Sequence, residues 1–296
     1  MKMDAIRVGA FDVRRVPEMT APLMPVLEFF PELTVEMLGT VRSLLPVGNL
    51  TSADEMILSF HSYVVNTGRY TILIDTCCGN DKQRPSRPAF SNLATDYLEA
   101  LAAAGVHPEA VDYVMCTHLH WDHVGWNTRL VSGVWSPTFP NAKYIMARRE
   151  YDFWNDAYTR DPSGRHGPGF ADSVAPIVRA EKAILVEDDF EIDAGVWLEP
   201  CHGHSPGHVV VNLESGDGRG LMTGDAIHHR LQLHYPALST IADTDEDLAR
   251  ETRTALLERH ADTGHILFPS HFPPPSFGSI RRQSNGEGYI YSSDTE

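Results

Sequence analysis

The sequence has few cysteines, fewer basic than acidic residues, and no long apolar run. Its 296 residues include 4 cysteines and no Cys-x-x-Cys pair, which excludes a disulfide-dense scaffold and predicts reduced, buried thiols. The 24 Lys and Arg face 40 Asp and Glu, for a net charge of −16, so neither nucleic acid nor an anionic membrane surface is an expected partner. No stretch reaches the roughly eighteen consecutive apolar residues of a membrane span.

The first residues also lack the apolar core of a secretory signal, so we expect a cytoplasmic protein. The apolar share of 42% and the charged share of 22% fit a folded chain and exclude wholesale disorder. A chain of this length is long for one domain and short for two, and we predict a single α/β domain over residues 1–296. Within it, residues 1–55 are expected to give a first strand at 5–15 and then, over the Pro-rich residues 16–50, a long ordered loop acting as a lid or interface segment.

Strand-type and helix-type patterns occur in the same order twice along the chain. In the first half, strands are predicted at 57–65, 70–74, 113–116 and 142–146, with helices over 91–104 and 148–158. In the second half, strands are predicted at 196–199, 208–213, 220–223 and 266–268, with a helix that begins at Thr244 as N-cap. This order predicts two similar halves, each a sheet with helices on one face.

Histidine is unusually frequent, with 15 residues, and several lie in one segment, Cys116–His123. His118 and His120 are two positions apart and project to the same side of an extended backbone. Asp122 and His123 add an oxygen and a nitrogen directly afterwards. Four ligand-type residues within six positions crowd a single tetrahedral ion, so we predict two adjacent metal ions. A His-rich surface loop is disfavoured because the segment follows a buried strand.

The segment resembles the His-x-His-x-Asp-His signature of the metallo-β-lactamase-fold superfamily. Four further motifs resemble those of the family in the same order, at 73–76, 203–208, 223–225 and 270–272. One departure is Cys77, which stands where the family usually has glycine. The five motifs together span residues 73–272 and leave the N-terminal segment and the C-terminal tail uncovered.

The resemblance implies a four-layered αβ/βα sandwich with two divalent metal ions at the edge of its two sheets. Zn²⁺ is the first expectation for both, and Mn or Fe stays open. The implied ligands are His118, His120 and His204 for one ion, Asp122, His123 and His271 for the other, and Asp225 with a hydroxide bridging both. Neutral imidazoles keep Zn²⁺ strongly Lewis acidic, and two cations lower the pKa of a shared water. His208 is expected to support the ligands rather than to bind metal. His228 and His229 follow Asp225 closely and are expected at the mouth of the site. The histidines without motif context are expected to play no part in the site; they are His61, His107, His166, His234, His260 and His265.

The implied reaction is hydrolysis of a small ester-like substrate, with a lactone as the first candidate. Asp225 or Asp122 would handle the proton. His228, which stands where related acyl-homoserine lactonases have Tyr, would either donate a hydrogen bond to the substrate or only line the site. Residues 224–228 and 271–275 also resemble the methyl parathion hydrolase branch, so hydrolysis of organophosphate triesters or aryl esters and hydrolytic dehalogenation are alternatives.

Other functions of the same fold fit this sequence less well. Zinc β-lactamases generally lack the bridging Asp, flavodiiron enzymes need a flavin domain, and nucleases need a basic surface that a charge of −16 opposes. An inactive binding module has no physical reason to keep seven ligands. The expected partner is a small-molecule substrate. The apolar residues of the N-terminal segment are expected either to line its pocket or to seal the core or a homodimer interface.

Overall fold

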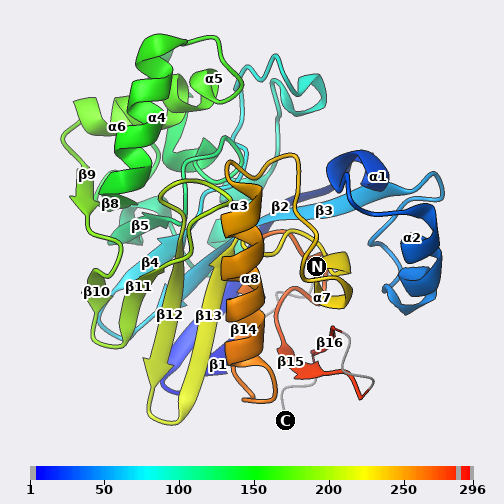
Figure 1. Cartoon of the computed structure of the whole chain (residues 1–296). Coiled ribbons are helices and arrows are strands. Elements are labelled where there is room, and N and C mark those ends of the chain that lie inside the picture. Colours follow the sequence, from blue (N-terminus) through cyan, green and yellow to red (C-terminus); the bar gives the residue numbers. More distant parts are fainter. Residues whose placement is uncertain (1–4, 285–287, 294–296) are drawn as a thin grey trace.

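Two β-sheets pack face to face in the computed structural model, which describes residues 5–284 and 288–293 (Figure 1). The first sheet has the strand order β1-β2-β3-β4-β5-β8-β9 and the second has the order β10-β11-β12-β13-β14. The first is built from β1 Ala5–Val8, β2 Phe11–Pro25, β3 Glu55–Asn66, β4 Thr71–Ile74, β5 Tyr113–Cys116, β8 Lys143–Ala147 and β9 Ala183–Val186. The second is built from β10 Glu191–Asp193, β11 Val196–Pro200, β12 Val209–Ser215, β13 Gly218–Gly224 and β14 Ile266–Pro269.

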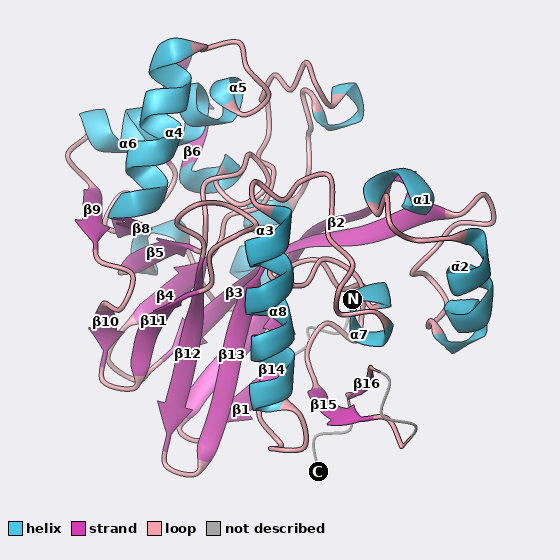
Figure 2. Ribbon diagram, viewed as in Figure 1, coloured by secondary structure: helices cyan, strands magenta, loops and turns pink. Residues whose placement is uncertain are grey.

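Helices cover the outer sides of both sheets and also lie beside the extended ends of β2 and β3 (Figure 2). They are α1 Val26–Phe29, α2 Val35–Val41, α3 Tyr97–Ala103, α4 Arg148–Arg160, α5 Gly167–Gly169, α6 Ala175–Arg179, α7 Leu231–His234 and α8 Glu246–His260. Two separate hairpins pair β6 Thr128–Val131 with β7 Val134–Pro137, and β15 Ser279–Arg282 with β16 Tyr289–Ser292. No helix in the described ranges is long and apolar enough to cross a membrane.

The hydrophobic core is divided in a way that defines four layers. One cluster lies between the sheets and joins side chains such as Val65 of β3 to others such as Val211 of β12. A second packs α3 and α4 against the outer face of the first sheet, and a third packs α8, through Leu257, against the outer face of the second. The alternation of the strands accounts for this division, because successive residues point to opposite faces. The predicted αβ/βα sandwich with two similar halves is confirmed.

The N-terminal segment differs from its prediction. Residues 16–25 are not a loop but continue β2, which pairs antiparallel with β3 as far as Pro25. β1 pairs only with residues 11–14, so the rest of β2 is an edge where proline needs no partner for the missing N–H. The register shifts beside Pro17 and between Pro22 and Pro25, which is how a strand accommodates proline.

Two predicted helices also change their bounds. The helix expected over 91–104 begins only at Tyr97, because residues 91–96 have no helical structure. The helix of the second half is capped by Asp245, whose side chain accepts a hydrogen bond from the Leu248 N–H, rather than by Thr244. The four cysteines are buried and unpaired, as predicted.

Candidate metal centre

The predicted ligands all follow strand ends at one edge of the two sheets. β4 and β5 run parallel in the first sheet, and β13 and β14 run parallel in the second, so the carboxyl ends of each pair meet. The segment 117–123 follows β5, Asp225 follows β13, and His271 follows β14. The remaining residue, His204, lies in the loop between β11 and β12. Residues separated by more than 150 positions are therefore brought together by strand topology alone.

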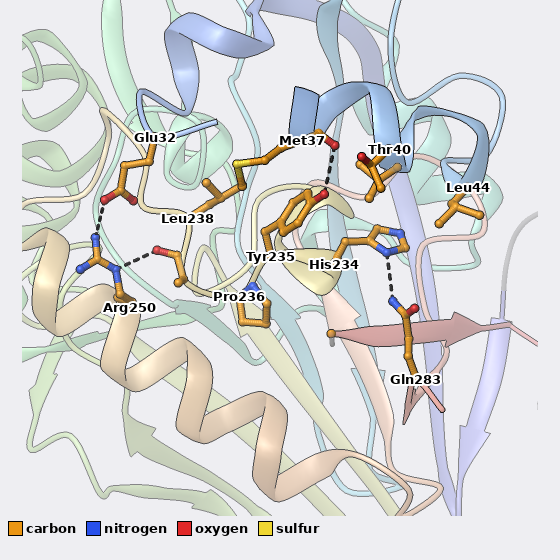
Figure 3. A pocket seen from close by; sticks show the side chains of 13 residues that line it. Glu32, Met37, Thr40, Leu44, His234, Tyr235, Pro236, Leu238, Arg250 and Gln283 are labelled. Carbon is orange, nitrogen blue, oxygen red and sulfur yellow. Dashed lines mark hydrogen bonds and ion pairs between the residues drawn. The ribbon is translucent and has the colours of Figure 1, made fainter. Parts of the chain in front are cut away.

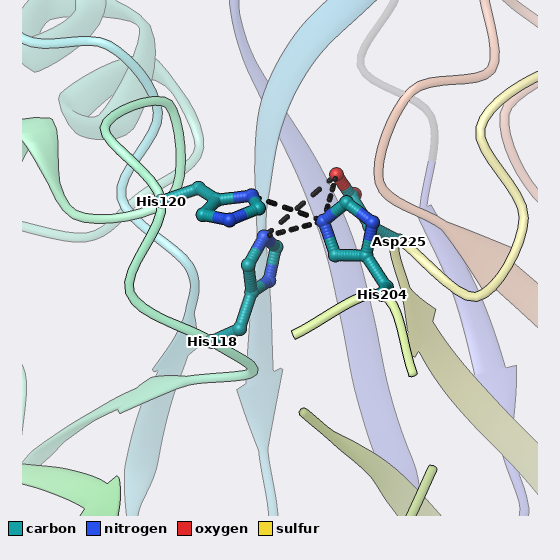
Figure 4. Close-up of side chains that lie close together, drawn as sticks. All are labelled: His118, His120, His204 and Asp225. Atoms are coloured by element: carbon teal, nitrogen blue, oxygen red, sulfur yellow. Dashed lines mark hydrogen bonds and ion pairs between the residues drawn. The ribbon is translucent and has the colours of Figure 1, made fainter. Parts of the chain in front are cut away.

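The first group consists of three imidazoles and one carboxylate oxygen. His204 Nε2 lies 3.2 Å from His118 Nε2 and 3.0 Å from His120 Nδ1. Asp225 Oδ2 lies 3.4 Å from His204 Nε2 and 3.8 Å from His118 Nε2. Figure 4 shows the four side chains pointing toward one another. All four are buried, and their ligand atoms lie within 4.8 Å of one another.

The second group lies on the other side of Asp225. His123 Nε2 and His271 Nε2 are 3.2 Å apart, and Asp122 Oδ2 lies 3.6 Å from His271 Nε2. Asp225 Oδ1 is 3.2 Å from His123 Nε2 and 3.1 Å from His271 Nε2. The two oxygens of Asp225 thus face different groups, which is the arrangement that a bridging carboxylate requires.

Hydrogen bonds on the far side of each ring determine which nitrogen carries the proton. His204 Nδ1 donates to Asp243 Oδ1 at 2.9 Å, and His123 Nδ1 donates to Asp75 Oδ2 at 2.8 Å. His271 Nδ1 lies 3.2 Å from the Ser59 carbonyl. Each of these rings therefore turns a lone pair into the cluster.

The converging nitrogens fit a metal centre. Two imidazole nitrogens that face each other at 3.2 Å are placed to bind one cation between them. Two nitrogens on one tetrahedral Zn²⁺ at about 2.0–2.1 Å would be about 3.3 Å apart, close to the separations found here. Asp225 Oδ1 is also a buried oxygen without a hydrogen bond. The residues present thus fit two divalent ions.

The electrostatics of the cluster lead to the same requirement. Burial lowers the pKa of His123 and of His271, but the carboxylate of Asp225 outweighs burial and raises both. Burial alone would raise the pKa of Asp225, yet the imidazoles of His123 and His271 hold it well below its usual range. Burial and neighbouring imidazoles lower the pKa of His118, which favours the neutral form that binds metal. The centre is thus arranged around positive charge.

His208 is held by hydrogen bonds outside the cluster. Its Nδ1 donates to the Cys201 carbonyl at 3.0 Å, and its Nε2 accepts from the Asp225 N–H at 3.0 Å. Both nitrogens are engaged, so no lone pair remains for a metal. The approach requires Gly224, which has a φ of +51° and whose Cβ, if present, would meet His208 Nε2 at 2.4 Å.

His228 lies inside the cluster rather than at its rim. Its Nε2 is 3.2 Å from Asp225 Oδ2, and its ring centroid is 4.7 Å from that of His204 and 5.4 Å from that of Phe29. Neither ring nitrogen of His228 forms a well-directed hydrogen bond. Burial lowers the pKa of His228, so the ring is neutral and has one N–H to donate.

Glu150 is a supporting residue that the sequence motifs did not indicate. Its buried carboxylate accepts hydrogen bonds from the Leu119 N–H at 3.0 Å and from the Gly207 N–H at 2.8 Å. It also accepts from Ser205 Oγ at 2.8 Å and from Trp154 Nε1 at 2.6 Å. Glu150 therefore connects the loop of His118 and His120 to the loop of His204. A lone acidic residue in the first turn of a predicted helix was the only signal in the sequence.

His166 was expected to play no part in the site, and the structure corrects this. Its ring stacks on that of His120, with centroids 4.2 Å apart and an interplanar angle of 18°. It lines the cleft over the metal cluster, together with Phe29 and Trp121. The loop that carries His166 has no motif, so its position became visible only in the fold.

A large cavity lies away from the candidate metal site. It measures about 830 Å³ and is lined by residues of α2, α7 and α8, including Met37, His234 and Arg250 (Figure 3). None of the predicted ligands lines it, whereas a smaller cleft, of about 40 Å³, contains His120, Asp122, Asp225 and His271. The ligand chemistry identifies the smaller cleft as the site.

The N-terminal segment contributes to several places at once. Leu23 and Phe29 line the cleft over the cluster. Phe30 is fully buried in the core that α1 and α2 form with β3. Met37 lines the large cavity. The two expectations for this segment, lining a pocket and sealing the core, thus apply to different residues.

Comparison with known proteins agrees with this architecture. Residues 60–271 match the family model of the metallo-beta-lactamase superfamily. An N-acyl homoserine lactonase of Bacillus cereus is 27% identical over 247 residues, which are 79% of this chain and 87% of that protein. The N-acyl homoserine lactonase AttM of Azorhizobium caulinodans is 32% identical over 184 residues, which are 59% of this chain and 64% of that protein.

Solved structures share the fold over nearly the whole chain. The dizinc quorum-quenching lactonase AidC, in complex with the product N-hexnoyl-L-homoserine, superposes with a TM-score of 0.79 at 22% identity, covering 99% of this chain and 98% of that one. The hydrolase AbOPH superposes with a TM-score of 0.79 at 23% identity, covering 98% of this chain and 96% of that one. The likeness extends to the N-terminal segment, which the sequence motifs leave uncovered.

Proposed function

Because the chain belongs to the metallo-beta-lactamase superfamily, we propose that it is a dinuclear metal-dependent hydrolase of small ester-like substrates, with lactones first. The observation that carries this proposal is the position of Asp225, whose two oxygens face two separate groups of imidazoles at 3.1–3.4 Å. The distant relationship to acyl-homoserine lactonases supports the choice of lactones.

Each proposed ligand has a defined place. His118, His120 and His204 would hold one ion, Asp122, His123 and His271 the second, and Asp225 both. When bound, two divalent ions, Zn²⁺ by preference, supply Lewis acidity toward a carbonyl oxygen and lower the pKa of a shared water. Asp75 and Asp243 orient His123 and His204 through the hydrogen bonds described above, which fixes the ring planes and makes the free nitrogens more basic.

Two side chains would act on the substrate itself. His228 lines the cleft, and its neutral ring would donate an N–H to the oxygen on which negative charge develops. Asp122 is the more exposed of the two acids, with 14% of its side chain accessible against 5% for Asp225. It would therefore pass the proton to the leaving oxygen, while both oxygens of Asp225 stay engaged with the imidazoles.

A second candidate activity is the hydrolysis of phosphotriesters or aryl esters. It is favoured by the sequence likeness of residues 224–228 and 271–275 to the methyl parathion hydrolase branch. The same groups would serve, because a phosphoryl oxygen accepts the same hydrogen bond from His228 as a carbonyl oxygen does.

The test is a screen of the purified protein against lactones, aryl esters and phosphotriesters, with the metal content measured on the same sample. We expect close to two ions per chain and hydrolysis of at least one lactone. Active protein with one ion or none would contradict the dinuclear centre. Hydrolysis of phosphotriesters without any lactone would select the second candidate.

A further inference from the structure

Two arginines lie at the cleft of the metal cluster, although the chain has a net charge of −16. Arg87 and Arg165 line the cleft together with Asp122, Asp225 and His271. Arg87 belongs to the loop between β4 and α3, and Arg165 to the loop between α4 and α5. The two loops touch, because Ser86 Oγ donates a hydrogen bond to the Arg165 carbonyl at 3.5 Å. Two segments far apart in the sequence thus bring positive charge to one place.

Neither guanidinium is neutralised by the protein. Within residues 5–284 and 288–293, neither arginine forms an ion pair with a carboxylate. Arg165 Nη1 donates to the Ile241 carbonyl at 3.2 Å, and Arg87 Nη1 donates to the Ser86 carbonyl at 3.3 Å. Each guanidinium has five N–H donors, so most donors stay free for a ligand. The two acids that line the cleft, Asp122 and Asp225, belong to the proposed metal centre.

The two charges also influence each other. Burial and then the charge of Arg87 lower the pKa of Arg165, while Asp122 opposes this effect. Both arginines also lower the pKa of His166, after burial. Like charges placed together without a counter-ion cost free energy, and an anion bound between them would remove that cost. The opposite wall of the cleft is apolar, with Leu23, Phe29 and Leu58.

We propose that Arg87 and Arg165 form an anion-binding subsite beside the metal centre, and that the substrate is an ester or lactone that carries an oxyanion of its own. A guanidinium matches a carboxylate or a phosphate with two parallel hydrogen bonds, so both groups qualify. The apolar wall would take the remaining carbon skeleton. The proposal rests on the proposed hydrolase function and names a substrate class for the same site.

The first test compares 4-nitrophenyl hemiglutarate, which has a free carboxylate, with its neutral methyl ester. We expect kcat/KM for the acid to exceed that for the methyl ester by about 10-fold or more. Arg165→Gln or Arg87→Gln should each lower kcat/KM for the acid by about 10-fold. In both variants, kcat/KM for the methyl ester should change by less than about twofold. Added salt should weaken the preference, because partly exposed charges are screened. Arg160→Gln, at the exposed end of α4, is the matched control and should change neither substrate.

A binding measurement separates this subsite from the hydrolase proposal. Calorimetric titration should give tighter binding of glutarate and of 4-phosphonobutanoate than of butyrate, and Arg165→Gln should abolish the difference. Which of the two dianions binds better identifies the oxyanion. If no ester is hydrolysed but this binding pattern holds, the hydrolase proposal fails and the anion subsite stands. Equal turnover of acid and methyl ester in both wild type and Arg165→Gln would overturn the subsite. Loss of metal in Arg165→Gln would also overturn the subsite, because it would show that Arg165 positions Asp122 instead of binding an anion.

Discussion

Glu150 should control the metal affinity of the centre without touching a metal ion. Its carboxylate accepts four hydrogen bonds, two of them from backbone N–H groups in the loops that carry His118, His120 and His204. Glu150→Ala leaves four buried donors without an acceptor, each worth about 1–3 kcal/mol. Ser205 can rotate and water can enter the space, so we expect a loss of about 3 kcal/mol in the free energy of unfolding.

Glu150→Gln is the sharper change. The amide keeps one oxygen for two of the donors, and its NH₂ group can donate to the hydroxyl of Ser205 instead of accepting from it. Only one backbone N–H, that of Gly207, then loses its acceptor, which costs about 1–3 kcal/mol. The loop of His204 should shift relative to His118, so the affinity for the first ion should fall about 10–100-fold, as is usual for residues that orient ligands.

Glu18 provides the matched control. It is a half-buried carboxylate that also has four donors, the N–H groups of Cys78 and Gly79, Thr95 Oγ1 and Trp126 Nε1. None of these belongs to the loops bridged by Glu150. Urea unfolding should show that Glu18→Gln and Glu150→Gln are destabilised to a similar extent. Competition with a chromophoric chelator should show a reduced metal affinity mainly in Glu150→Gln. Equal metal affinities in the two variants would refute the role given to Glu150.

Four further results are expected. Asp225→Ala should lose at least the second ion, measured by elemental analysis, because two cations without a bridging charge repel each other; two retained ions would contradict the bridge. His204→Ala should lose an ion with nearly all activity, whereas His208→Ala should keep most of its metal, and equal metal loss in both would be inconsistent with their hydrogen bonds. His228→Ala should lower kcat by about 10²–10³-fold with unchanged metal content; a wild-type kcat would make it a lining residue only. Burial lowers the pKa of His229 to about 4. The neutral ring therefore contributes its full stabilisation of the fold above the unfolded pKa of about 6.5, and this contribution is lost as pH falls toward 4. Urea midpoints of wild type should therefore fall more steeply over that range than those of His229→Gln.

The local part of the site was predictable from the sequence, since a spacing of two places His118 and His120 on one side of an extended segment. The order of strands and helices also indicated two similar halves, because alternation along the chain reports which face of a strand is buried. The residues alone could not predict that His204 and His271 lie close to that segment. It depends on which strands become neighbours, and only the resemblance to a known family predicted it.

The residues that sequence reasoning missed act through tertiary contacts. Glu150 occupies an ordinary position in the first turn of α4, and nothing in its neighbours indicates that Leu119 and Gly207 lie within hydrogen-bond distance. The continuation of β2 through Pro22 was missed for a related reason. Proline is a strand breaker in general, and its tolerance here depends on an open edge that only the sheet order reveals.

The distribution of ligands over the two halves has a consequence for the whole fold. In the proposed centre, the first half would supply His118 and His120 to one ion and Asp122 and His123 to the other, while the second half would supply His204 to the first and His271 to the second. Each ion would therefore join both sheets. The cluster between the sheets already packs them through apolar side chains, and at the open edge the halves meet through imidazole nitrogens 3.2 Å apart. Binding of the ions would add metal–ligand bonds between the halves, so that folding and assembly of the proposed centre would be coupled at the same edge.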